Sequence, residues 1–257
     1  MKPTFVGVVH LLPLPGSPRG GTLADALQRA LLDAHALREG GVDAVIVENL
    51  GDAPYTAGTV DPVTVAAMTR IAGALRDVLP DQHLGINVLR NDALAALSIA
   101  HVVDADFVRI NVHTGAMVTD QGLIEGRARD TLLERQRLGA RVQLVVDVLV
   151  KHAVPLGNPD LADVARDTAY RGLADVLVVT GSGTGRPHDP ARVAAVKNAV
   201  PDRPVWIGSG VTPPRARSLG AEGAIVGTWL HEHSDLSRPV DVDRVRAMRA
   251  ALDAQGT

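Results

Sequence analysis

A carboxylate, an amine and an imidazole stand close together after one apolar run of the chain. Asp147 ends the run 142–147, and Lys151 and His152 follow it. A carboxylate and an amine at this spacing could exchange protons with a substrate, and a lysine removed from water could form a Schiff base with a carbonyl. The competing interpretation is a salt bridge from Lys151 to Asp147 or Glu48, which would serve the fold instead.

Polar residues take the same position relative to other apolar runs. Glu48 ends the run 44–48, and Arg109 and Asn111 lie in a run that leads into His113. A guanidinium inside an apolar run needs an anionic partner, which could be a nearby carboxylate or a substrate carboxylate or phosphate. The residues predicted to act in catalysis are Asp147, Lys151, Glu48, His113 and Asn111.

Some of these side chains are also candidate ligands for a divalent metal ion. Imidazole and carboxylate groups bind such ions, but no two candidates stand four residues apart on one predicted helix. A metal site would have to be assembled across strands, and a hydrogen-bonded polar ring without metal is the favoured interpretation. The metal candidates are His10, Glu48, Asp52 and His152.

Two glycine-containing loops late in the chain point to a phosphate ligand. The run 205–208 leads into Ser209 and Gly210, and the run 224–227 leads into Thr228. Glycine lets backbone N–H groups approach an anion, and a helix N-terminus adds the positive end of its dipole. Either loop alone could be only a tight turn, but the two together favour a phosphate. The predicted ligand-binding residues are Gly208, Ser209, Gly210, Gly227, Thr228, Thr180, Gly181, Arg109 and Asn87.

Short β-branched runs that alternate with longer Ala/Leu/Arg-rich stretches must position these residues. The predicted strands are 5–10, 44–48, 84–88, 107–112, 142–147, 176–180, 205–208 and 224–227. The predicted helices are 22–39, 62–79, 92–101, 123–138, 160–171, 189–199, 213–218 and 241–254. Apolar runs without alternation are typical of parallel strands that are covered on both faces.

This pattern predicts an α/β fold, a single (β/α)8 TIM barrel over residues 1–257. The main competitor, an open doubly wound sheet, normally has a G-x-G-x-x-G turn after its first strand, where this chain has Leu11-Leu12-Pro13-Leu14-Pro15-Gly16. Active sites of TIM barrels lie at the C-terminal ends of the strands, where the polar residues fall here. Loops 11–21, 50–60 and 112–122 could cover that mouth.

Composition excludes several classes of function. The chain has no cysteine, which excludes disulfides, zinc–thiolate sites and a cysteine nucleophile. A net charge of −3 argues against a basic surface for nucleic-acid binding. With only 2% aromatic residues, the chain also lacks side chains on which bases could stack. No apolar stretch approaches the ~18 residues of a membrane span, so we expect a cytoplasmic protein. His231 is expected at the surface, and Trp206 between the barrel and its helices.

The chain resembles the BtpA family along nearly its whole length. The runs that carry the resemblance are 9–18, 46–49, 51–54, 85–92, 107–115, 119–122, Asp147 with 150–152, 180–181, 184–185 and 208–211. Tyr55 departs mildly from the phenylalanine expected there. The resemblance implies a ribulose-phosphate-binding barrel. The family takes its name from cyanobacterial members needed for photosystem I biogenesis, but similar proteins occur in organisms without photosynthesis.

These observations leave three hypotheses. The first is an enzyme (isomerase, lyase/aldolase or glycosidic-bond hydrolase) that acts on a phosphorylated small molecule such as a sugar phosphate or nucleotide-like compound. The second is a non-enzymatic assembly factor for photosystem I or another membrane complex, as the family name implies. The third is a regulator that binds a metabolite without turning it over. A divalent metal cofactor and homo-oligomerisation stay open.

Overall fold

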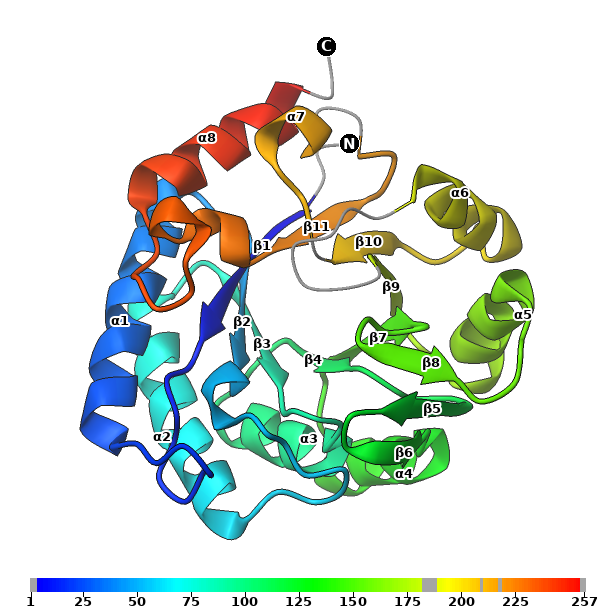
Figure 1. The fold of residues 1–257 in the computed structure, drawn as a ribbon, viewed down its shortest axis with the longest axis horizontal. Coiled ribbons are helices and arrows are strands. Elements are labelled where there is room, and N and C mark those ends of the chain that lie inside the picture. Colours follow the sequence, from blue (N-terminus) through cyan, green and yellow to red (C-terminus); the bar gives the residue numbers. More distant parts are fainter. Residues whose placement is uncertain (1–3, 182–188, 209, 217–218, 255–257) are drawn as a thin grey trace.

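Parallel strands close into a barrel, as the sequence predicts. The computed structural model describes residues 4–181, 189–208, 210–216 and 219–254. In this part of the chain the strands pair around the barrel in the order β1-β2-β3-β4-β7-β9-β10-β11 (Figure 1). Their bounds are β1 (Thr4–His10), β2 (Ala44–Glu48), β3 (His83–Asn87), β4 (Phe107–Ile110), β7 (Gln143–Val148), β9 (Val176–Thr180), β10 (Val205–Gly208) and β11 (Gly223–Val226).

Helices surround the barrel (Figure 1). They are α1 (Leu23–Gly40), α2 (Pro62–Val78), α3 (Ala93–Val102), α4 (Ala128–Leu138), α5 (Leu161–Arg166), α6 (Pro190–Ala199), α7 (Pro213–Ala216) and α8 (Val242–Asp253). Short helical turns are η1 (Leu50–Asp52), η2 (Asp167–Arg171, a π-helix), η3 (Thr228–Leu230) and η4 (Glu232–Ser234). None of the helices in the described residues has the length and apolarity needed to cross a lipid bilayer.

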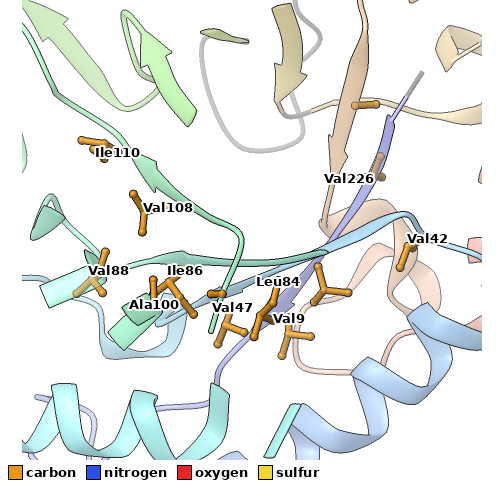
Figure 2. Close-up of a cluster of buried hydrophobic side chains, with 14 of the residues drawn as sticks. Val9, Val42, Val47, Leu84, Ile86, Val88, Ala100, Val108, Ile110 and Val226 are labelled. Atoms are coloured by element: carbon orange, nitrogen blue, oxygen red, sulfur yellow. The ribbon is translucent and has the colours of Figure 1, made fainter. Parts of the chain in front are cut away.

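Apolar side chains on the outer face of the strands pack against the helices. Val47, Ile86 and Val108 project outward from neighbouring strands and meet residues such as Ala100 of α3 in one large buried cluster. Figure 2 shows part of this cluster, with side chains from several strands gathered between the strands and the helices. Burial of this kind stabilises the fold by about 25 cal/mol for each Å² of apolar surface removed from water.

A second apolar cluster fills the inside of the barrel. Phe107 and Trp206 are its largest members, and their rings meet edge to face with centroids 5.9 Å apart. Gly85 and Gly223 make room for them, since a Cβ atom would lie 2.2 Å from the Phe107 ring and 2.6 Å from the Trp206 ring. The expectation that Trp206 lies between barrel and helices is therefore wrong, because these glycines leave space for it inside.

A small antiparallel sheet with strand order β6-β5-β8 stands beside the barrel (Figure 1). Its strands are β5 (Ala116–Thr119), β6 (Gly122–Glu125) and β8 (Ala153–Pro155). The predicted helix over 123–138 is wrong in its first part, because that part is β6 and the helix begins only at Ala128. Met117 and Ile124, facing each other across β5 and β6, bury their side chains in a local cluster with Val150.

Candidate active site

The two-residue period of a strand changes the barrel interior from apolar to polar at its C-terminal end. Ile46 and Val145 belong to the apolar interior cluster. Glu48 and Asp147 come two residues later on the same strands and so project from the same faces. His10 is paired in register with Glu48. The polar residues thus form the last interior layer, where the barrel opens.

Arg109 is held by carboxylates on both sides. Its Nη2 lies 3.1 Å from both Oδ1 and Oδ2 of Asp147, and its Nε lies 3.2 Å from Oδ1. On the other side, Nη1 is 3.7 Å from Oε2 of Glu48. Asn111 donates a further hydrogen bond of 2.8 Å to Asp147 Oδ2. Asp147 is therefore fully occupied as the anchor of Arg109, a role that the sequence left open among several anionic partners.

The charged state of Arg109 is secured by these neighbours. Burial by itself disfavours the guanidinium charge, but the carboxylates of Asp147 and Glu48 outweigh it and raise the pKa of Arg109. Gly208 is packed closely on the neighbouring strand, since a Cβ there would lie 3.1 Å from Cγ1 of Val178 and 3.3 Å from Cγ2 of Thr180. Gly208, predicted to bind the ligand, thus packs against β9 and lines neither of the two cavities described below.

A first cavity of about 220 Å³ opens beside β10 and β11. Gly210, Gly227 and Thr228 line it, together with His10 and the upper residues of the neighbouring strands. Gly210 has φ +66°, a conformation that favours glycine. Ser209, predicted to bind phosphate in the same loop, lies outside the described residues.

A second cavity of about 490 Å³ also reaches Arg109. Arg90, Tyr55 and Asn111 line it. Arg90 is buried and donates a 2.8 Å hydrogen bond from Nη2 to the carbonyl oxygen of Lys151. Tyr55 donates to the carbonyl of Leu50 at 2.9 Å, and burial and the Glu48 carboxylate raise its pKa. His152 is exposed and also lines this cavity.

Lys151 lines both cavities, as do Glu48, Leu50 and Arg109. Within the described residues, no hydrogen bond or ion pair joins its Nζ to another group, so the predicted alternative of a salt bridge to Asp147 or Glu48 is not formed. Burial and the positive charge of Arg109 lower the pKa of Lys151, although Glu48 and Asp147 oppose them. The result is a half-buried amine, easier to deprotonate than usual, between two cavities.

His10 meets a histidine from the far end of the chain. Its Nδ1 lies 3.3 Å from Nε2 of His231, and the ring centroids are 5.5 Å apart. His231 is completely buried, so the expectation that it lies at the surface is wrong. The loop after η3 carries it inward, where Arg29 of α1 and Asp33 hold that loop.

Several predicted site residues lie away from the two cavities. His113 is buried, and its Nε2 donates a 2.8 Å hydrogen bond to the carbonyl of Gly172. Asn87 supports Asn111 by donating to its Oδ1 at 3.2 Å. Thr180 and Gly181 line a separate cavity of about 500 Å³ that also reaches Lys151. Within the described residues, the Thr180 hydroxyl is buried without a hydrogen-bond partner.

The metal candidates are not brought together. Among the residues that the structure describes, no three histidine, aspartate or glutamate side chains form a group that could hold a metal ion. Asp52 instead accepts hydrogen bonds from the Leu14 amide (2.8 Å) and from Asn49 (3.0 Å), and so fixes the loop after β1. His10 turns toward His231 instead of Glu48 or Asp52.

Three residues of this site are not among the predicted catalytic, binding or metal residues: Arg90, Tyr55 and His231. Arg90 comes two residues after the third predicted strand, 84–88, so the rule that placed the other polar residues at the mouth also covers it. Tyr55 lies in a loop that was expected to cover the mouth. His231 carries no such signal, because its position depends on how the last loop folds back.

Comparison with known proteins agrees with this architecture. A model of the BtpA family matches residues 1–254. The chain is 47% identical over 250 residues to the photosystem I biogenesis protein BtpA of Synechocystis sp., covering 96% of this chain and 87% of that protein. It is 45% identical over 247 residues to an uncharacterized protein of Thermococcus kodakarensis, covering 95% and 93%.

Solved structures share the fold at low sequence identity. The structure of KGPDC from Streptococcus mutans superposes with a TM-score of 0.60 at 11% identity, covering 100% of both chains. Phosphoribosyl anthranilate isomerase from Thermus thermophilus superposes with a TM-score of 0.55 at 15% identity, covering 97% of this chain and 98% of that one. At these identities the likeness concerns the barrel and its topology alone.

Proposed function

The chain belongs to the BtpA family, and we propose that it is an enzyme that acts on a phosphorylated small molecule bound at the mouth of the barrel. The observation that carries the proposal is Lys151, whose amine stands unpaired among the described residues between two cavities. Buried cations are normally paired, and perturbed lysines in clefts are typical of catalytic sites.

The first cavity is the proposed phosphate site. The backbone at Gly210 and Gly227 approaches it without side chains in the way, and Thr228 adds a hydroxyl. In many TIM barrels the loops after the seventh and eighth strands, here β10 and β11, bind phosphate. Lys151 and Arg109 line the same cavity and supply positive charge to it.

The second cavity would hold the part of the substrate that reacts. Glu48, Lys151, Arg90 and Asn111 converge on it with one acid, two cations and one amide. A cation beside a carbonyl oxygen stabilises the negative charge that develops during proton abstraction or carbon–carbon cleavage. Isomerisation and aldol-type cleavage both depend on this stabilisation of negative charge. Cleavage of a glycosidic bond would instead use Glu48 as the general acid.

The test is a thermal-shift screen with sugar phosphates, nucleotides and their unphosphorylated counterparts. A ligand at about 100 times its dissociation constant stabilises a fold by about 2.7 kcal/mol. We expect a stabilisation that requires the phosphate and is lost in Thr228→Glu, which puts a carboxylate into the first cavity. Thr59→Glu, at an exposed position that lines neither of the two cavities, is the control. Equal shifts from phosphorylated and unphosphorylated compounds would refute the phosphate site.

A second function, that of a biogenesis factor like the named cyanobacterial relative, has one observation in its favour. Val118 of β5 faces Leu123 of β6 and Val154 of β8 in register, and these side chains are 47%, 50% and 66% exposed. An apolar row of this kind would suit contact with another protein. Val118→Ser with Val154→Ser would then abolish the biological role while ligand shifts persist, the reverse of the result expected for an enzyme.

A further inference from the structure

The backbone around His231 determines which of its nitrogens carries a proton. Nδ1 lies 2.7 Å from the carbonyl oxygen of Arg238, which only accepts, and 3.4 Å from Nη2 of Arg29, which only donates. The contact with the carbonyl is much the shorter of the two, so Nδ1 carries the hydrogen. Arg29 also donates to the Arg238 carbonyl and, at 2.9 Å, to that of Ser237, so this stretch of backbone is fixed. A neutral His231 with hydrogen on Nδ1 has a lone pair on Nε2.

That lone pair in turn sets the proton of His10. Nδ1 of His10 lies 3.3 Å from Nε2 of His231, so His10 donates and its own hydrogen stands on Nδ1. The unprotonated nitrogen of a neutral His10 is then Nε2. Within the described residues, Nε2 of His10 has no hydrogen-bond partner, and His10 lines the first cavity.

Gly227 keeps the space beside this nitrogen open. A Cβ atom at position 227 would lie 2.5 Å from Cε1 and 3.0 Å from Nε2 of His10. Any other residue there would fill the approach to the Cε1–Nε2 edge of the ring. The glycine predicted to cradle phosphate therefore also exposes the free nitrogen of His10.

We infer that Nε2 of His10 is the general base of this site and that His231 is the positioning residue that holds His10 in the required tautomer. This inference rests on the proposed function. In the step, Nε2 takes a proton from a substrate hydroxyl or from a carbon next to a carbonyl, and the electron pair of that bond stays on the substrate. The imidazolium keeps its Nδ1–H bond to His231 and returns the proton to the product.

The charges around His10 favour its neutral form. Burial lowers its pKa well below the usual value, and His231, Lys151, Arg109 and Arg29 lower it further. Glu48, its partner on β2, is the nearby carboxylate at the mouth, and it is already beside Arg109. A base must be unprotonated before it reacts, and this environment meets that condition at neutral pH.

Nitrogen-15 NMR of the full-length protein with labelled histidine tests the tautomer without any substrate. We expect His10 to show hydrogen on Nδ1 and none on Nε2 at neutral pH, and His231→Leu to abolish this preference. His35→Gln is the control, because His35 lies on the exposed face of α1. This variant should lose only the signal of His35 and leave the His10 signal unchanged. A hydrogen on Nε2 of His10, or an imidazolium, would overturn the inference and leave the proposed function standing.

Turnover tests the base itself. For any phosphorylated sugar that the wild-type protein converts, His10→Gly should lower kcat at least 100-fold with little change in KM, and added imidazole should restore part of the rate. Unchanged kcat would overturn the assignment of the base. If the wild-type protein converts no member of the panel, the proposed function fails, and the base role fails with it. The NMR result separates these two failures, because the tautomer does not depend on a substrate.

Discussion

The guanidinium of Arg109 and the carboxylate of Asp147 form a buried pair in which Nη2 is 3.1 Å from both carboxylate oxygens. Their side chains are 5% and 0% exposed. The two residues stand on adjacent strands, β4 and β7, so the pair ties the barrel wall together at its mouth. The pair also orients Nη1 of Arg109, the nitrogen that makes no hydrogen bond to Asp147, toward Glu48.

Because each partner leaves an uncompensated buried charge when the other is removed, single substitutions should be costly. Asp147→Leu and Arg109→Met should each lower the free energy of unfolding by about 3–5 kcal/mol, and the double variant should lose much less than their sum. Urea unfolding measures this. The exposed pair Arg166–Asp163 is the control and should contribute less than about 1 kcal/mol. Additive losses at the buried pair would contradict this account.

Lys151→Met should strongly reduce turnover with little loss of stability. The amine makes no ion pair within the described residues, so its removal breaks no contact of the fold, while catalysis would lose its cation at the junction of the two cavities. We expect kcat to fall by about 10²–10⁴. The control is Arg141→Met, which removes an exposed cation just before β7, at the opposite end of the barrel. Equal activity of the two variants would remove Lys151 from the mechanism.

Gly227→Ala should displace the His10 ring, because the new methyl group would lie 2.5 Å from Cε1. We expect a loss of about 1–3 kcal/mol in unfolding free energy, as for overpacked cores, together with weaker ligand binding. Gly58→Ala is the matched control, since no atom lies within 4 Å of a Cβ there. Calorimetric unfolding, with and without a phosphorylated compound that stabilises the wild-type protein, measures both the loss of stability and the loss of binding. Normal ligand binding by Gly227→Ala would show that this space is not used.

Acidification should destabilise the protein through its buried histidines. Burial lowers the pKa of His113 and of His231, whereas the pKa of histidine in the unfolded chain is about 6.5. Below about pH 6.5 the unfolded state therefore binds more protons than the folded state, and stability falls as the pH falls toward the lowered pKa values. Each histidine contributes a slope of at most about 1.4 kcal/mol per pH unit.

The pH dependence can be measured by urea unfolding at about pH 7.5 and about pH 5.5, which lie on either side of the unfolded pKa. His113→Gln should reduce the loss between these conditions, and the exposed His35→Gln should not. If the wild-type protein and both variants lose the same unfolding free energy between the two pH values, the pH dependence belongs to other groups.

The barrel could be predicted because its signal is local and repeated. Each strand is a short apolar run, each is followed by a helical stretch, and the polar residue that ends a run falls at the same end of the barrel as the others. Glu48, Asp147 and Arg109 reach the mouth for this reason alone. The helix predicted over 123–138 failed in its first part because Ile124 gains its burial from a strand partner, Met117, and not from helical neighbours.

The sequence by itself thus determined the fold and the rim on which the polar residues lie, since both follow from periodicity along the chain. The tertiary structure decided which of them meet. It paired Arg109 with Asp147 and left Lys151 unpaired among the described residues. It also brought His231 to His10 across 221 positions of sequence. Such contacts depend on the packing of the whole barrel and its last loop, and no local pattern encodes them.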